Sequence, residues 1–164
     1  LLLEVTEEAR SAWPSSKPLF VRISGSDNHP DGWTVEDSVV LAGKLKALGV
    51  DAVHVSSGGF DGAAFNPKAL YQLPLSTEVR KEADIPTVAV GLITTPQEAE
   101  AIIANGDADL VALARAALDD PNWPLHARHV LDNNENAYAD WPLQAGYAIR
   151  NKDRALRERA FAEA

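Results

Sequence analysis

Two residues that follow apolar segments have the chemistry needed to bind an anion. Arg115 comes directly after the apolar run at residues 110–114, and Gly91 ends the apolar run at residues 87–91. A guanidinium at the carboxyl end of a buried strand needs an anionic partner, and a missing side chain lets a ligand approach backbone N–H groups. The pair therefore predicts a phosphate site. An ion pair between Arg115 and a neighbouring carboxylate, with Gly91 needed only for a turn, fits the spacing equally well.

A third candidate, Arg22, lies inside an apolar segment. It is the central residue of the run Phe-Val-Arg-Ile-Ser at residues 20–24. A cation on a buried strand must contact a polar group. One suitable partner is the pyrimidine edge of a flavin, which gains negative charge when the flavin is reduced. The alternative, which the residue types alone favour slightly, is a structural ion pair with Glu36 or Asp37.

The histidines do not indicate a metal centre. His126 and His129 are three residues apart on an expected helix, but no third ligand stands at a fitting position. A solvated helix face is the simpler interpretation, and His54 is expected to be a satisfied strand residue. The chain has no Cys, which excludes disulfides and thiolate chemistry.

Four strand–helix units are expected to position these residues. Thr34 begins a capping-box pattern, Thr95 and Pro96 begin another helix, and Gly49 and Gly106 mark helix ends. Ala99, Ile102 and Ile103 are expected on one apolar helix face. Short apolar runs rich in β-branched residues predict strands. The expected strands are 18–24, 52–57, 87–91 and 110–114, and the expected helices are 1–12, 34–48, about 75–83, 95–106 and 124–131.

Alternating strands and helices with nearly continuous apolar strands predict a parallel sheet covered by helices. A doubly wound open sheet and part of a TIM barrel both fit this pattern. The helix expected at residues 1–12 would belong to a preceding unit whose strand is missing. Four units are roughly half of a barrel, which typically has ~250 residues.

Composition limits the partners. The formal charge of −9 argues against a nucleic-acid binder, and no apolar run approaches the ~20 residues that span a bilayer. The chain begins with Leu1 and contains no Met. We therefore expect a piece of a longer chain, with a removed tag or leader as the alternative.

A series of short motifs resembles the second half of the old yellow enzymes, in particular their xenobiotic-reductase-like branch. The resemblance covers roughly residues 1–131, and it rests on the order and spacing of the motifs together. The motifs are FVRIS at 20–24, GWT at 32–34, LGVD at 48–51, VSSGG at 55–59, VGLIT at 90–94, ADLV at 108–111 and DPNWP at 120–124.

The resemblance implies a fold and a cofactor. Residues 1–132 would form about the last four βα units of an FMN-binding (β/α)8 barrel, and residues 133–164 a tail. Arg22 would contact the FMN pyrimidine, while Gly91, Leu92, Ala114 and Arg115 would bind its phosphate. The family usually has Gly-Arg where this chain has Ala114-Arg115. The extra methyl could crowd a backbone contact but leaves the guanidinium intact.

The resemblance also implies a cytoplasmic ene-reductase. NADPH or NADH would reduce FMN, which would reduce the C=C bond of an α,β-unsaturated carbonyl compound. The family's catalytic residues would all precede Leu1, so no catalytic residue is expected in this chain. Trp141 or Tyr147 could reach a neighbouring subunit's active site, or these aromatic residues could simply anchor the tail.

The resemblance leaves two rival functions open. One is a barrel enzyme that binds a phosphorylated metabolite without flavin. The other is a non-catalytic half-barrel that only associates with a second copy or with its missing half.

Overall fold

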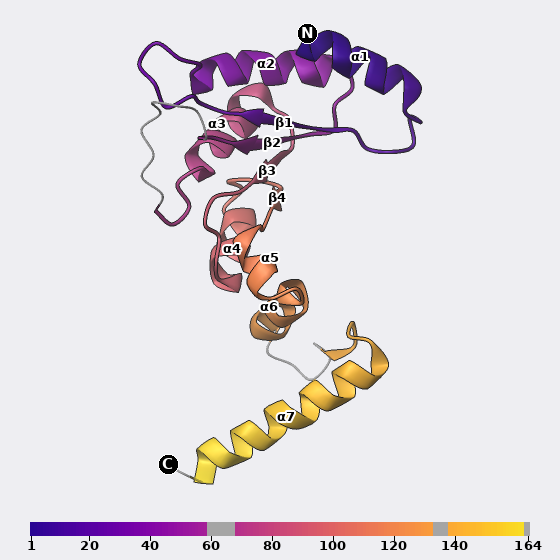
Figure 1. Cartoon of the computed structure of the whole chain (residues 1–164), viewed down its shortest axis with the longest axis vertical. Coiled ribbons are helices and arrows are strands. Elements are labelled where there is room, and N and C mark those ends of the chain that lie inside the picture. Colours follow the sequence, from indigo (N-terminus) through magenta and orange to yellow (C-terminus); the bar gives the residue numbers. More distant parts are fainter. Residues whose placement is uncertain (59–67, 133–137, 163–164) are drawn as a thin grey trace. The chain divides into compact units, whose positions relative to one another are not determined.

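The centre of the fold is a parallel sheet of four strands. The structure is a computed structural model that describes residues 1–58, 68–132 and 138–162. In this part of the chain the strands lie in the order of the sequence, and every neighbouring pair is parallel (Figure 1). The strands are β1 (Phe20–Ser24), β2 (Ala52–Ser56), β3 (Thr87–Ala89) and β4 (Leu110–Val111).

Helices alternate with these strands, as the sequence predicted. The helices are α1 (Leu2–Ala12), α2 (Val35–Ala47), α3 (Leu73–Ala83), α4 (Pro96–Ala104), α5 (Arg115–Asp119), α6 (Trp123–Asp132) and α7 (Leu143–Ala162). None of the described helices is both long enough and apolar enough to cross a membrane.

Local signals account for several helix ends. Thr34 and Asp37 form a reciprocal capping box, in which the Thr34 hydroxyl accepts from the backbone of Asp37 and the Asp37 carboxylate accepts from the backbone of Thr34. Gly49 has φ +82° and Gly106 has φ +70°, so both are left-handed residues just beyond a helix. The predicted start at Pro96 is confirmed, and there the Glu98 carboxylate accepts from the backbone of Thr94.

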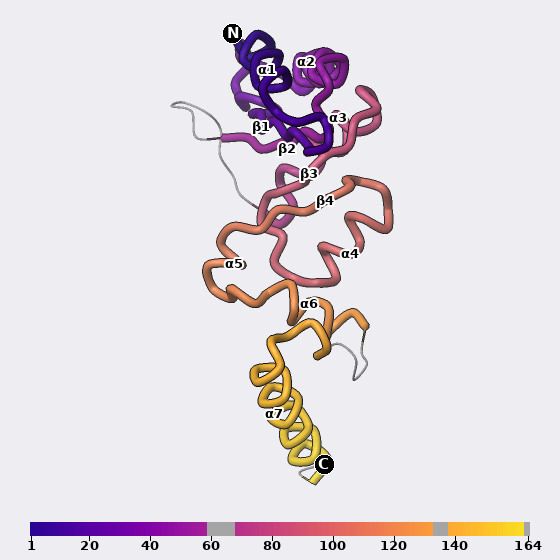
Figure 2. Tube along the Cα trace, turned by 90° about the vertical axis from the view of Figure 1, so that its right-hand side faces the viewer, coloured from indigo at the N-terminus to yellow at the C-terminus, as the bar shows by residue number. Residues whose placement is uncertain are grey.

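Alternation along the strands separates the two faces of the sheet. Ile23, Val53 and Val55 point to the face covered by α2 and α3, where they pack with Leu45 and Val79. Figure 2 shows α2 and α3 on the same side of the strands. Burying each of these aliphatic side chains contributes roughly 1.5–3 kcal/mol. The intervening strand residues, including Arg22, therefore point to the opposite face.

The last predicted strand is shorter than expected. The prediction of a strand through Ala114 is wrong, because β4 ends at Val111 and Ala112 adds only one further bond to Ala89. Arg115 consequently begins α5 rather than ending a strand. Ala99 and Ile102 on α4 are buried, whereas Ile103, which was expected on the same apolar face, is exposed.

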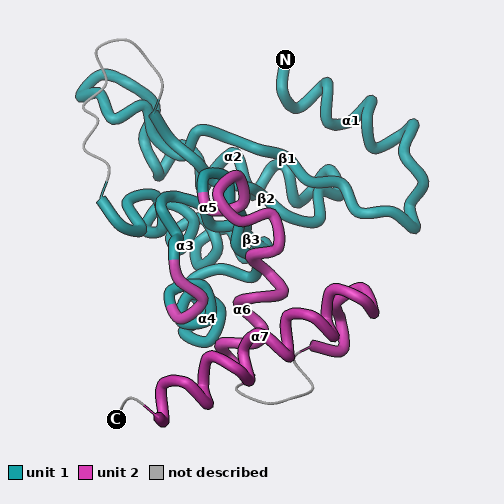
Figure 3. Tube along the Cα trace, turned by 60° about the horizontal axis from the view of Figure 1, so that its bottom comes forward, with its two compact units in different colours: residues 1–94, 98–115 teal, residues 95–97, 116–164 magenta. Residues whose placement is uncertain are grey.

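The chain divides into two compact units, coloured separately in Figure 3. Unit 1 comprises residues 1–94 and 98–115 and contains the sheet with α1, α2 and α3. Unit 2 comprises residues 95–97 and 116–164 and contains α6 and α7. Residues 133–137 and 163–164 of the expected tail, and Gly59 of the expected Gly58–Gly59 loop, lie outside the described residues. The predicted boundary after residue 132 stays a prediction.

Candidate functional site

The carboxyl edge of the sheet carries the candidate site. Because all four strands are parallel, the segments that follow them emerge at the same edge. Gly91 and Leu92 follow β3, and Ala114 and Arg115 follow the neighbouring strand β4. The predicted phosphate residues therefore come from adjacent strands of unit 1.

Arg22 lies on the sheet face opposite the helices. Its Nε atom donates to the Ser56 hydroxyl at 3.2 Å, and its register partner on β2 is His54. Among the described residues Arg22 makes no ion pair, and Asp37 is engaged in the helix cap. The predicted alternative, an ion pair with Glu36 or Asp37, is not what the structure shows. The terminal guanidinium nitrogens make no hydrogen bond within the described residues.

His54 is a neutral neighbour of Arg22. Burial lowers the pKa of His54, and the positive charge of Arg22 lowers it further. Its Nε2 atom is buried and has no hydrogen-bond partner in the described part of the chain. The expectation of a fully satisfied histidine is therefore wrong. Of the register partners Arg22 and His54, Arg22 is therefore the cation.

The turn after β3 has an unusual backbone. Gly91 has φ +121° and Leu92 has φ +55°. A leucine in the left-handed region is uncommon, and strained residues of this kind often occur at ligand-binding sites. A Cβ atom on Gly91 would lie 3.0 Å from both the backbone N and the Cβ of Gln72. The glycine is thus required by the left-handed turn and by a close approach of the chain itself. This supports the alternative in which the turn needs the glycine, and it does not depend on the approach of a ligand.

Arg115 is exposed and unengaged. It makes no hydrogen bond or ion pair with any described residue. The alternative in which a neighbouring carboxylate pairs with Arg115 is not seen within the described ranges. The preceding Ala114 is also exposed. The first residue of α5 is therefore a solvent-exposed arginine whose guanidinium is unpaired as far as the described residues extend.

Gln72 is a residue of this edge that the sequence analysis did not find. It is buried, and its Nε2 donates to the carbonyl of Ser57 at 2.7 Å. In the sequence it reads as an ordinary polar residue before a helix. The sequence signal that could have pointed to Gln72 is its place directly before Leu73 and Pro74, where a helix begins.

The two tail aromatics behave differently within unit 2. Trp141 is 7% exposed and its ring lies 5.0 Å from that of His126, whereas Tyr147 is 65% exposed. With Arg150 they help line a pocket of about 300 Å³. The burial of Trp141 favours the anchoring role, and Tyr147 remains available for contact.

The histidines of α6 are paired rather than simply solvated. His126 Nδ1 lies 2.5 Å from the Asp120 carboxylate. His129 Nε2 lies 3.2 Å from the Tyr138 hydroxyl, which donates to Asp153 at 2.9 Å. His126 is nevertheless exposed, as predicted for a solvated helix face, whereas His129 is only partly exposed. Across the described residues no group of three or more His, Asp or Glu side chains could hold a metal ion.

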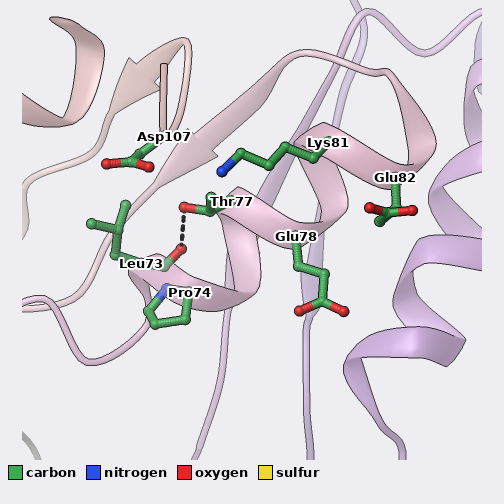
Figure 4. Close-up of a pocket in the computed structure, with 7 residues that line it drawn as sticks. All are labelled: Leu73, Pro74, Thr77, Glu78, Lys81, Glu82 and Asp107. Atoms are coloured by element: carbon green, nitrogen blue, oxygen red, sulfur yellow. Dashed lines mark hydrogen bonds between the residues drawn. The ribbon is translucent and has the colours of Figure 1, made fainter. Parts of the chain in front are cut away.

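A second pocket lies along α3, and it shares no residue with the candidate site at the carboxyl edge. It has a volume of about 460 Å³, and none of the predicted flavin contacts lines it. Figure 4 shows Glu78, Lys81 and Glu82 projecting from α3 around it, with Asp107 from the segment before β4. Its lining is mainly a solvated helix face.

These features define a parallel α/β protein with a candidate anion site at the carboxyl ends of two neighbouring strands. The model of the NADH:flavin oxidoreductase / NADH oxidase family matches residues 1–134. The chain belongs to this family, which confirms the resemblance drawn from the motifs.

Curated relatives agree with this assignment. The chain is 49% identical over 124 residues to an NADPH dehydrogenase of Geobacillus thermodenitrificans, covering 76% of this chain and 36% of the relative. It is 46% identical over 134 residues to an NADPH dehydrogenase of Geobacillus sp. strain WCH70, covering 82% and 39%. It is 43% identical over 132 residues to an NADPH dehydrogenase of Bacillus licheniformis, covering 80% and 38%. The chain thus spans well under half the length of these relatives.

A solved structure supports the fold. The crystal structure of a mutant of the active chimera of (S)-mandelate dehydrogenase superposes with a TM-score of 0.50 at 22% identity. The match covers 77% of this chain and 30% of that chain. Together with the family assignment it indicates an α/β fold of the TIM-barrel type.

Proposed function

We propose that this chain supplies the phosphate and pyrimidine contacts of an FMN site in an NAD(P)H-dependent flavin oxidoreductase. The proposal is supported above all by Arg115, whose guanidinium has no partner within the described residues and which follows β4, next in the sheet to the strand that leads into the left-handed turn at Gly91 and Leu92. Bound FMN would supply the hydride-transfer chemistry, while the protein would bind it and set its electronic environment. Family membership and the NADPH dehydrogenase relatives favour this cofactor.

Each proposed contact has a physical basis in this chain. Arg115 would pair with the phosphate, whose charge and geometry suit a guanidinium. Backbone N–H groups of the turn at Gly91 and Leu92 would bind the same phosphate. The backbone of Ala114, directly before Arg115, would lie against the phosphate as well. Arg22 would hold its positive charge against the pyrimidine edge, and neutral His54 would add no second cation there.

The reaction we propose for the whole protein is reduction of an activated C=C bond. NADPH or NADH would be the electron donor, and an α,β-unsaturated carbonyl compound or a related electron-poor molecule the acceptor. The chain would form about the last four βα units of the barrel, with residues 133–164 as a tail. Tyr147, which is exposed, could then contribute to a neighbouring subunit, while buried Trp141 anchors the tail. The remaining units could come from the rest of a longer chain or from a partner.

Flavin content and turnover of the native protein test the proposal. The purified protein should show visible flavin absorbance and enone-dependent oxidation of NADPH. Arg115→Gln should weaken FMN binding, because it removes the charge but keeps a polar side chain. Arg154→Gln is the matched control, since Arg154 lies on α7 with an exposed side chain. Absence of flavin from the native protein, together with binding of phosphorylated metabolites, would favour the barrel enzyme without flavin.

A further inference from the structure

Gln72 is a buried amide that the proposed flavin contacts leave unused. Its side chain is 4% exposed, and it occupies the position before α3 without capping that helix through its side chain. A buried amide costs free energy unless it is hydrogen-bonded. The side chain of Gln72 therefore serves a contact other than the helix end.

The amide of Gln72 binds the segment that follows β2. Nε2 donates to the carbonyl oxygen of Ser57 at 2.7 Å and lies 3.3 Å from the Ser57 hydroxyl. Only the NH₂ end of an amide can donate to a carbonyl, so this bond fixes which way the amide points. The amide oxygen is consequently directed elsewhere.

The same residue contacts the turn that follows β3. A Cβ on Gly91 would lie 3.2 Å from the Oε1 of Gln72, and 3.0 Å from its backbone N and its Cβ. Gly91 is itself buried and has φ +121°. Gln72 thus joins two turns at the carboxyl edge of the sheet, and it does so from the beginning of a helix.

From these contacts we infer that Gln72 is a positioning residue for the phosphate end of the flavin site. Its bond to Ser57 and its packing against Gly91 hold the turn at Gly91 and Leu92 in the conformation that presents backbone N–H groups. An anion bound by such groups depends on their directions, which a small change in φ alters. Gln72 need not touch the phosphate. The inference rests on the proposed function.

The test compares FMN with riboflavin, which has the same ring and ribityl chain but no phosphate. Flavin fluorescence is titrated with the native protein after removal of bound flavin. Gln72→Leu should weaken FMN binding about tenfold, which equals about 1.4 kcal/mol, and should leave riboflavin binding unchanged. The control Gln144→Leu, at an exposed position of α7, should alter neither affinity.

A second variant separates the hydrogen bond from the packing. Gln72→Glu keeps the size of the side chain, but an ionised carboxylate cannot donate to the Ser57 carbonyl, whereas a protonated one can. The FMN affinity of Gln72→Glu relative to the wild type should therefore rise as the pH falls through the carboxyl pKa. The same ratio for Gln72→Leu should stay flat. Circular dichroism on each variant shows whether it is folded.

The outcomes separate failure of the inference about Gln72 from failure of the proposed FMN-binding function. Equal FMN affinity in Gln72→Leu and the wild type, or an equal loss for FMN and riboflavin, overturns the inference. A wild-type protein that binds neither flavin refutes the proposed function instead, and the inference with it. If Gln72→Leu does not fold, the pH series of Gln72→Glu decides, and a flat ratio there also overturns the inference.

Discussion

Replacing Gly91 by alanine should both destabilise the protein and weaken phosphate binding. Gly91 is buried at the carboxyl edge of the sheet with φ +121°, a conformation that residues with a Cβ rarely adopt. The new methyl would also meet the backbone N and Cβ of Gln72 at 3.0 Å. Neither neighbour is the flexible end of a side chain, so the two segments must move apart.

The magnitude follows from these two effects. Holding a non-glycine residue in a sparsely populated backbone conformation costs about 1–3 kcal/mol, and overpacking a close contact costs about 1–3 kcal/mol more. Relaxation of the turn relieves part of the sum. We therefore expect Gly91→Ala to lower the free energy of unfolding by about 2–4 kcal/mol.

Gly43→Ala is the matched control. Gly43 lies within α2, and a Cβ there meets nothing within 4 Å. Because alanine is the better helix former, this change should stabilise the protein by roughly 0.5–1 kcal/mol. Urea unfolding gives both free energies, and FMN titration gives the effect on binding. A Gly91→Ala protein as stable as the wild type would show that the turn is not constrained in this way.

Three further predictions concern other parts of the structure. Asp109 accepts two bonds from Arg80 and one from the Thr87 backbone, and the Arg80 bond chiefly holds the pKa of Asp109 below its ordinary value. The stabilisation that this carboxylate provides should be present at neutral pH and should be lost as the pH falls through that lowered pKa. In urea unfolding, the free energy of unfolding of Asp109→Asn should therefore depend less on acid pH than that of the wild type. The same pH profile in both proteins would contradict this. Tyr138→Phe removes the hydrogen bond to Asp153 and should lower the free energy of unfolding by about 1 kcal/mol. Circular dichroism should show α7 melting at a lower temperature, and an unchanged melting temperature would show that the hydrogen bond does not stabilise the helix. The 164-residue chain alone should lack ene-reductase turnover and should self-associate, and a strictly monomeric scattering mass would count against the latter.

The expected self-association has a structural cause. Within the described residues β1 and β4 are the outer strands of the sheet, so each has one unpaired edge. Phe20 on β1 is 50% exposed and Leu110 on β4 is 47% exposed. Exposed strand edges with apolar side chains pair readily with another chain. Further strands of a barrel or a second copy of the chain would each pair with these edges.

At the candidate site, the sequence predicted where Gly91 and Arg115 lie but did not predict their contacts. Gly91 was expected to be glycine either so that a ligand could approach it or because a turn requires it. The structure supports the turn, and it adds that the chain itself, at Gln72, fills the space beside Gly91. Arg115 was expected at the end of a strand and instead begins α5 without a partner in the described ranges. The position at the sheet edge was predicted, whereas the contacts around it were not.

The sequence by itself determined the order of strands and helices, the capping of α2 by Thr34 and the left-handed end at Gly49. These features depend on residues only a few positions apart, and local backbone preferences decide them. The motif order likewise identified the family, because it depends on sequence alone. A parallel sheet followed from the alternation of apolar runs, and the carboxyl edge followed from the parallel sheet.

Only the tertiary structure decided which side chains meet. The bond from Gln72 joins a residue 15 positions away in the sequence, and that from Arg80 to Asp109 joins residues 29 positions apart. The pairing of His129 with Tyr138 and the early end of β4 also depend on packing between elements. Burial and long-range hydrogen bonds arise only when distant segments pack together, so local preferences contain little information about them.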